Sequence, residues 1–231
     1  MLRTVLHRSV LPLLLATVTC SAAALSLSAL SNQDAASGLK AALEKGSASA
    51  VGKLGVPGGF LDNDKVKIQL PGLLEQARPL LQMSGRGRQL DDLVVAMNRA
   101  AEAAVPLARP LLINAVKSMT VTDAKNILAG GNTSVTDFFR QKTAQPLAVK
   151  FLPIVKRVTD RSGLGTQYNA VMSQTAKFQL VSGSQASVEA YVTQRALDGL
   201  YYMVGEEEKA IRRDPLGSGS AIIGKVFGSL K

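Results

Sequence analysis

The stretch that decides the fold is residues 187–213, SVEAYVTQRALDGLYYMVGEEEKAIRR. Large apolar side chains recur in it at helical spacing, which places them on one face of an α-helix. The members of this stripe are Leu197, Leu200, Val204 and Ile211. Pro215 follows closely, and proline cannot continue a helix because it lacks the backbone N–H. The pattern predicts one long helix that buries a single face against other elements.

Further helices are predicted on the N-terminal side and the C-terminal side of this one. Ser31, Thr120 and Ser134 each precede an aspartate by three residues, an arrangement that resembles the capping box at a helix start. Glycines and prolines mark the helix ends. The expected helices are 31–54, 71–83, 91–104, 111–119, 120–129, 135–143, 146–161, 165–177, 187–213 and 218–229. The sequence therefore predicts an all-α fold, a single bundle of about eight to ten helices.

Residues 65–70 depart from the helical pattern. Val66, Ile68 and Leu70 alternate with polar residues, and this period of two residues indicates an extended chain. No second strand offers itself, so we expect a short extended segment that lies against the bundle without forming a sheet.

The first 24 residues have the three parts of a secretory signal: basic residues, an apolar stretch at 10–18, and small residues at Ala22–Ala24. The apolar stretch is about nine residues long, whereas crossing a bilayer takes ~20. We therefore expect cleavage after Ala24, a periplasmic or otherwise exported product, and a mature helical domain at 25–231. Lipid anchoring through Cys20 is the alternative, although the residues before it match a lipobox poorly.

Cleavage at this point also limits the chemistry of the mature chain. Cys20 and His7 are the only cysteine and the only histidine in the sequence. Without them, catalytic arrangements that use histidine or cysteine are excluded, as are zinc sites built on imidazole or thiolate. No glycine-rich phosphate loop is present either. We expect no cofactor and no metal.

Composition and charge point to the same fold class and to an acidic partner. Tryptophan is absent and aromatic residues make up 4% of the chain, which favours helix-on-helix packing over a sheet sandwich. Two of the 27 basic residues lie in the signal, so the mature chain has a net charge of +8 instead of +10. Such a surface attracts anionic lipid headgroups or envelope polysaccharide. Nucleic acid is not expected, because no basic run interleaves with aromatics. The alternative is charge that serves solubility alone.

Four stretches of the mature chain are distinctive as a set. They are MNRAAEAAVP at 97–106, FLPIVK at 151–156, the segment 191–200 with YVT and ALDGL, and the segment 206–215 with EEE, IR and DP. Together they resemble the bacterial family of domain of unknown function 4197, over 25–228. The resemblance implies an exported helical envelope protein. It implies no activity and no catalytic residues.

Glu207 is the sharpest candidate carboxylate. It fills the missing place in the apolar stripe of the 187–213 helix, where a carboxylate needs a cation, a hydrogen-bond network or a raised pKa. We expect an ion pair with Arg99 or Arg212; an acid, a metal ligand or a ligand-binding group is the alternative. Glu208 and Arg212, one turn apart, are expected to form an ordinary exposed pair.

Asn98, Arg99 and Glu102 form a second polar cluster, within an alanine-rich helix. Small neighbouring residues would let another helix approach closely. If that helix is 187–213, Arg99 would pair with Glu207. Glu102 and Glu207 would then be the two carboxylates of an enzyme, which is the competing functional class.

Two further features suggest contact with a partner. Arg86 and Arg88, in the sequence Gly85-Arg86-Gly87-Arg88, would bind an anion with backbone amides and guanidiniums, or simply end a helix and face solvent. The amphipathic C-terminal segment 220–231 would lie on a membrane, or dock on the bundle and complete its core.

The expected function is therefore that of a non-enzymatic exported binding module. Its partner would be an apolar or anionic envelope component, such as a lipid, or a protein. One alternative is a carboxylate enzyme centred on Glu207 and Glu102, with Arg99 as the electrostatic partner; another is a purely structural or assembly role at the envelope.

Overall fold

The structure is a computed structural model, and it describes residues 31–131, 133–161, 165–169 and 187–228. Within these ranges the chain is all-α, as predicted, with eight α-helices, one short 3-10 helix and no strand. The elements are α1 (Asn32–Leu54), α2 (Gly72–Met83), α3 (Gly87–Ala104), η2 (Val105–Leu107), α4 (Ala108–Lys117), α5 (Val121–Ala129), α6 (Ser134–Thr159), α8 (Val188–Arg213) and α9 (Ala221–Gly228). Residues 165–169 are also helical. The predicted signal at 1–24 and the rest of the helix expected at 165–177 lie outside the described residues.

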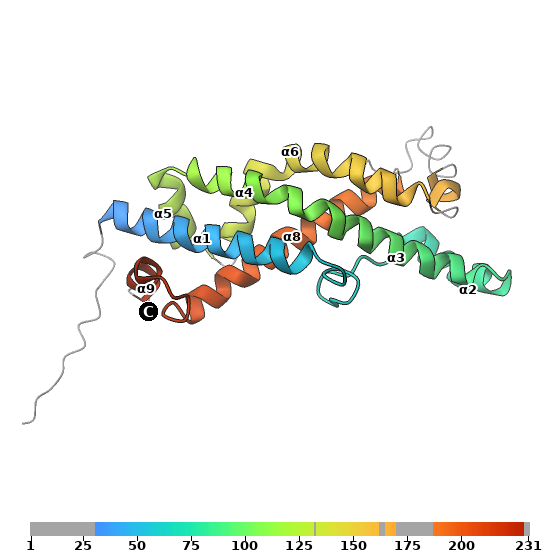
Figure 1. Ribbon diagram of the computed structural model, residues 1–231, viewed down its shortest axis with the longest axis horizontal. Helices are drawn as coiled ribbons and strands as arrows, with labels where there is room; N and C mark the ends of the chain where they lie inside the picture. Colours follow the sequence, from blue (N-terminus) through green and yellow to red (C-terminus); the bar gives the residue numbers. More distant parts are fainter. Residues whose placement is uncertain (1–30, 132, 162–164, 170–186, 229–231) are drawn as a thin grey trace, which may run out of the picture.

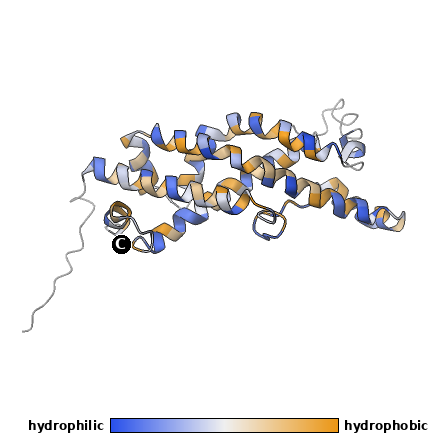
Figure 2. Cartoon of the chain, in the orientation of Figure 1, coloured by the Kyte–Doolittle hydropathy of each residue, from blue (hydrophilic) through white to orange (hydrophobic). Residues whose placement is uncertain are grey.

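The helices form an elongated bundle (Figure 1). The predicted long helix is α8, which packs against α6 and against α1, while α3 packs on α6. α3, η2 and α4 follow one another along the length of the bundle, and α9 folds back onto α1. Figure 2 shows hydrophobic and hydrophilic residues alternating around most helices, as expected when one face of each is buried.

Proline interrupts these helices less than predicted. α6 is one helix, although Pro146 was expected to separate a helix at 135–143 from another at 146–161; that prediction was wrong. Pro146 and Pro153 both lie on the exposed face of α6, so the carbonyls that lose a backbone donor lie on the solvent side. Buried residues recur at every fourth position along α6 and form a stripe that winds slowly around the helix, with both prolines outside it: Phe139, Thr143, Leu147, Phe151, Val155 and Thr159. Likewise α4 begins at Ala108 instead of 111, with Pro110 in its first turn.

Two of the three predicted helix starts are confirmed. The Ser31 hydroxyl accepts the amide of Asp34, and Thr120 forms a complete capping box with Asp123. The third was wrong, because α6 is capped at Thr133 without a side-chain bond. The Ser134 hydroxyl donates instead to the carbonyl of Ile127, at 3.1 Å, and so ties α6 to α5.

The predicted alternation of buried and exposed residues in the extended segment at 65–70 is confirmed. Val66, Ile68 and Leu70 are buried, while Lys65 and Gln69 are exposed. The segment lies directly on α8 at Gly199. A Cβ at position 199 would stand 2.8 Å from the Phe60 ring and 3.2 Å from the Val66 Cβ, so this close approach requires glycine.

The C-terminal helix α9 docks on the bundle. Ile223, Val226 and Phe227 are buried, and they pack mainly against α1. The apolar face that was considered for membrane contact is therefore covered by protein. None of the described helices is long and apolar enough to span a bilayer.

Candidate ligand-binding groove

Asn98 is fully buried and holds the extended segment in place. Its Nδ2 donates to the Ile68 carbonyl at 2.9 Å, and its Oδ1 accepts the Ile68 amide at 2.8 Å. Nδ2 also donates to the Val94 carbonyl one turn back. A side-chain amide has one donor group and one acceptor on the same plane, so it pairs with Ile68 as a neighbouring strand would. Asn98 therefore has a structural role in positioning residues 65–70.

Glu102, one turn further along α3, holds the turn that precedes this segment. Its Oε1 accepts the amides of Gly58, Phe60 and Leu61, each at 3.1 Å. Its Oε2 accepts from Arg99 at 2.6 Å. The carboxylate is 5% exposed and both oxygens are occupied. Glu102 thus fills a nest of backbone amides that would otherwise attract an external anion.

Of the neighbouring residues Glu207 and Glu208 on α8, Glu208 is buried and Glu207 is partly exposed. Glu207 pairs with Lys53 at 2.5 Å, so the predicted partners Arg99 and Arg212 were wrong for this residue. Glu208 is 3% exposed and pairs with Arg212, which corrects the expectation of an exposed pair. A step of three residues from Val204 leads to Glu207 and a step of four leads to Glu208, so the spacing fits either residue. Glu208 is buried because α5 and α9 contact the side of α8 that carries Arg212.

The Glu208–Arg212 pair joins three helices. Burial raises the pKa of Glu208, and the charge of Arg212 opposes that rise. The Arg212 guanidinium also donates to the Ile127 carbonyl at the end of α5, at 3.3 Å. It lies over the Phe227 ring of α9, 5.4 Å from the ring centre. Because these contacts link α8 to α5 and to α9, the Glu208–Arg212 pair stabilises the packing of the three helices.

The candidate anion-binding turn ends α2. Gly85 has φ of 76°, and its amide donates to the Gln82 carbonyl, while the Arg86 amide donates to the Leu81 carbonyl. These two bonds form the Schellman arrangement that closes a helix. The amides of Gly85 and Arg86 are therefore committed to α2, while the side chains of Arg86, in the turn, and Arg88, at the start of α3, are exposed.

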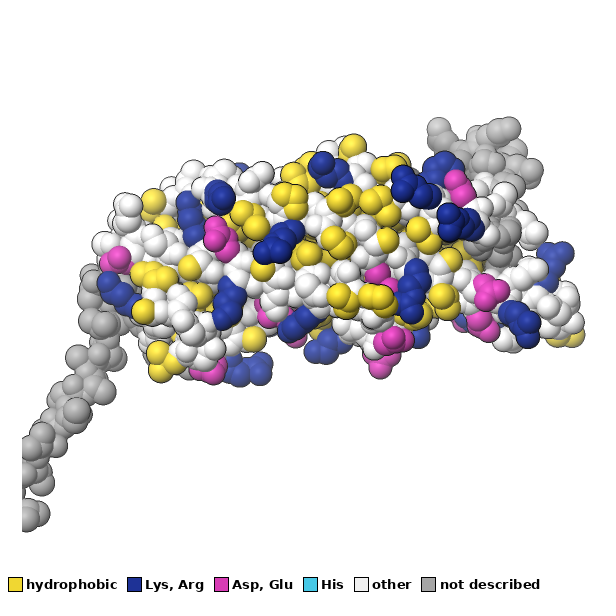
Figure 3. Space-filling model, in the orientation of Figure 1, with side chains coloured by type: hydrophobic (Ala, Val, Ile, Leu, Met, Phe, Trp, Pro, Cys, Tyr) yellow, Lys and Arg dark blue, Asp and Glu magenta, His cyan; other side chains and the backbone are white. Residues whose placement is uncertain are grey.

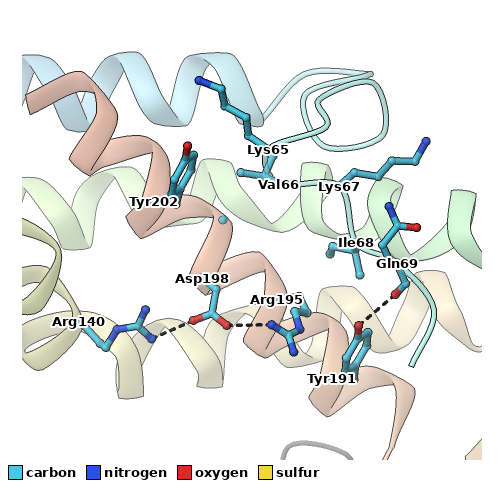
Figure 4. A pocket seen from close by; sticks show the side chains of 11 residues that line it. Lys65, Val66, Lys67, Ile68, Gln69, Arg140, Tyr191, Arg195, Asp198 and Tyr202 are labelled. Atoms are coloured by element: carbon cyan, nitrogen blue, oxygen red, sulfur yellow. Dashed lines mark hydrogen bonds and ion pairs between the residues drawn. The ribbon is translucent and has the colours of Figure 1, made fainter. Parts of the chain in front are cut away.

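A groove lies between the extended segment and α8 (Figure 4). Its volume is ≈ 540 Å³. The segment lines one wall with residues 65–69, α8 lines the other, and Arg140 of α6 closes one end. The α8 residues that face the groove are Tyr191, Arg195, Asp198, Gly199 and Tyr202.

The groove is strongly cationic. Asp198 is its only carboxylate, and it is shared by Arg140, at 2.9 Å, and Arg195, at 3.8 Å. Lys65 and Lys67 extend to either side of the segment and add two positive charges at the rim (Figure 4). Lys65 approaches Glu206 at 3.9 Å, and Lys67 has no ion-pair partner among the described residues. The groove therefore keeps an excess of positive charge.

Two tyrosines give the groove flat apolar surfaces beside its cations. The Tyr191 hydroxyl donates to the Gln69 carbonyl at 3.1 Å and so links α8 to the segment. The Arg195 guanidinium lies 5.3 Å from the Tyr191 ring centre. Tyr202 is 40% exposed, so its ring is open to a ligand. The described residues contain no group of three or more acidic, histidine or cysteine side chains that could hold a metal.

The sequence interpretation overlooked this groove. On α8 it is marked by Tyr191, Arg195, Asp198 and Tyr202, at steps of four, three and four, which place them on one helix face. That polar and aromatic stripe was the available signal. The opposite wall comes from residues more than a hundred positions earlier in the chain, and no local spacing connects the two.

These features define an all-helical bundle protein with a cationic groove on one side. The chain belongs to the family of proteins of unknown function DUF4197, whose family model matches residues 29–228. This confirms the family resemblance found in the sequence. No curated protein and no solved structure matches the chain.

Proposed function

We propose that this chain is an exported, non-enzymatic binding module whose ligand is an anionic component of the cell envelope, held in the groove between residues 65–69 and α8. The observation that carries the proposal is the charge of the groove, whose described lining contains four cations and one carboxylate. The export signal expected at 1–24 points to the envelope as the source of the ligand.

The arginines of the groove retain binding capacity. A guanidinium has five N–H donors, and Arg140 and Arg195 approach the same carboxylate. Their other donors are available to a phosphate or a second carboxylate, which arginine binds in a bidentate manner. Lys67 adds a charge that a ligand can approach without breaking an ion pair. This supports binding of an anion.

The tyrosines limit the class of ligand further. An exposed tyrosine ring favours a ligand with a carbon skeleton, since the ring offers apolar area and a flat face. A phosphorylated lipid headgroup and an acidic sugar both combine negative charge with such a skeleton. Their shared chemistry, an anion on a small polar carbon frame, is what the groove accommodates.

The enzyme alternative receives less support from the contacts. Both oxygens of Glu102 are bonded to backbone amides and to Arg99, and Glu207 is paired with Lys53. Neither carboxylate lines the groove. A general acid or nucleophile needs a reactive oxygen that faces the substrate, so these contacts favour binding over catalysis.

Native mass spectrometry of the protein purified from a periplasmic extract tests the proposal. We expect a bound small molecule on the wild type and on Lys150→Glu, and its loss from Lys67→Glu. Both substitutions replace a lysine by glutamate and so make the same change of charge. Lys67 lies at the groove rim, whereas Lys150 is the control, exposed on α6 outside the groove lining.

A titration then identifies the class of ligand. Glycerol 3-phosphate and glucuronate represent the headgroup and the acidic sugar, and NMR shifts of the Lys67 and Gly199 amides report on the groove. If neither probe shifts these amides at about 10 mM, or if Lys67→Glu retains the bound molecule, the proposal fails.

A further inference from the structure

The helix α2 is apolar on two sides. Leu74 is buried and Leu81 is partly buried, and these pack toward the bundle, where α2 contacts chiefly α3. On the outer side, Leu73 is 49% exposed, Leu80 is 70% exposed and Met83 is 86% exposed. A soluble surface helix normally presents polar residues on its outer side. The outer side of α2 therefore needs an explanation that the core does not supply.

These side chains lie at one end of the molecule. Figure 1 shows the turn between α2 and α3 at the right-hand end of the bundle. Figure 3 shows a small hydrophobic area at the tip of that end, with basic and acidic side chains nearby. Because the Gly85 turn is closed by two backbone hydrogen bonds, it holds Met83 on one side and Arg86 on the other in a defined arrangement.

The turn at this apolar end carries positive charge. Residues 76–90 contain three arginines and no carboxylate, and Glu75, Asp91 and Asp92 flank this stretch. Arg78 is engaged by Glu75, at 2.8 Å, and by Asp91, at 3.7 Å. Arg86 meets only the neutral Gln167, at 3.5 Å, and Arg88 has no ion-pair partner among the described residues. Two exposed arginines that form no ion pair among the described residues thus lie near two highly exposed apolar side chains.

We propose that the end formed by α2 and the start of α3 docks on an anionic lipid surface. Leu80 and Met83 enter the boundary between headgroups and acyl chains, and Arg86 and Arg88 pair with lipid phosphates. This combination of exposed apolar side chains and neighbouring cations is how peripheral segments bind anionic bilayers. The α9 helix does not supply this contact, because its apolar side is packed on α1. The proposal stands on residues that take no part in the groove.

Vesicle flotation with the mature chain tests the proposal. The wild-type protein should float with vesicles that contain about 30% phosphatidylglycerol in phosphatidylcholine. At least tenfold less protein should float with vesicles of pure phosphatidylcholine. The double variant Leu80→Gln, Met83→Gln should lower the partition coefficient of the protein onto anionic vesicles by about tenfold or more. The reason is that two large apolar side chains no longer enter the bilayer boundary. Arg86→Gln with Arg88→Gln should lower it on the anionic vesicles alone, and added salt should do the same.

Two controls separate this end from the rest of the surface. Leu216→Gln removes an apolar side chain that is 83% exposed in the turn between α8 and α9, and it should leave binding unchanged. Lys150→Glu changes the charge of an exposed lysine on α6, outside the groove lining, and should also leave vesicle binding unchanged. The groove proposal is tested with soluble probes in the absence of vesicles, so its failure is distinguishable from failure of this one. All variants change exposed side chains, and circular dichroism should show unaltered helix content and melting.

Three outcomes would overturn the proposal. The wild type stays unbound on anionic vesicles, or it binds neutral vesicles equally well, or Leu216→Gln weakens binding as much as the α2 substitutions. Sedimentation velocity without lipid adds a fourth. If the chain self-associates and Leu80→Gln with Met83→Gln abolishes this, the occupant of the surface is a second copy of the chain.

Discussion

Substitution of Asn98 by alanine should destabilise the fold more than any surface change, although it removes only a small polar group. The substitution leaves the amide and the carbonyl of Ile68 without their partners, and the Ile68 side chain is 2% exposed. An unsatisfied buried donor or acceptor costs about 1–3 kcal/mol, so the two together cost about 2–5 kcal/mol after the small gain in helix propensity from alanine. The Val94 carbonyl loses only a second donor, which adds little.

Urea unfolding followed by circular dichroism measures this loss as a lower midpoint at a similar slope. Asn114→Ala is the matched control, because Asn114 is exposed on α4 and its removal should change the free energy of unfolding by under about 0.5 kcal/mol. Asn98→Asp keeps an acceptor for the Ile68 amide but places a carboxylate oxygen against the Ile68 carbonyl, where the two oxygens repel. Its loss in free energy of unfolding should therefore be at least as large as that of Asn98→Ala. A loss below about 1 kcal/mol for Asn98→Ala would refute the claim that this amide holds the extended segment.

Three further changes test other contacts of the same region and of α8. Glu102→Gln keeps the shape but weakens charge-assisted bonds, so it should cost about 1.5–3 kcal/mol and speed hydrogen exchange of the amides at 58–61; unaltered exchange would contradict this. Burial raises the pKa of Glu208 above 4.5, so the folded state holds its proton to higher pH than the unfolded state. Stability should therefore fall as pH rises from about 4.5 through the raised pKa, and Glu208→Gln should flatten that part of the profile measured by urea midpoints. Gly199→Ala places a Cβ 2.8 Å from the Phe60 ring, in the turn before the segment, and should cost about 1–3 kcal/mol. At Gly52 a Cβ would meet nothing within 4 Å, so Gly52→Ala should stabilise α1 by about 0.5–1 kcal/mol; equal thermal shifts for the two variants would argue against the close packing at Gly199.

The helical fold was predictable because its signals are local. The capping residues Ser31 and Thr120, and the stripe of apolar residues in 187–213, act within one or two turns of the chain. The error at Pro146 has the opposite origin. Its local signal is a helix break, but six buried residues at steps of four, before and after Pro146, pack against the core and favour one continuous helix.

The error between Glu207 and Glu208 shows where a pattern of spacing stops being informative. After Val204, a step of three leads to Glu207 and a step of four leads to Glu208, and both belong to a helical stripe. The two positions differ by about 100° around the helix. The side that becomes buried is set by α5 and α9, whose residues contact Arg212 from elsewhere in the chain.

The amino-acid sequence on its own determined the helical class, most helix bounds, the buried alternation at 65–70 and the family, because each depends on residues close together in the chain. The tertiary structure decided that Glu208 and not Glu207 is buried, that Asn98 and Glu102 hold the extended segment and the turn before it, and that a cationic groove exists. The groove joins Lys67, Arg140 and Arg195, which come from three separate elements. Its charge therefore arises from packing, which brings together cations that no single stretch of the chain contains.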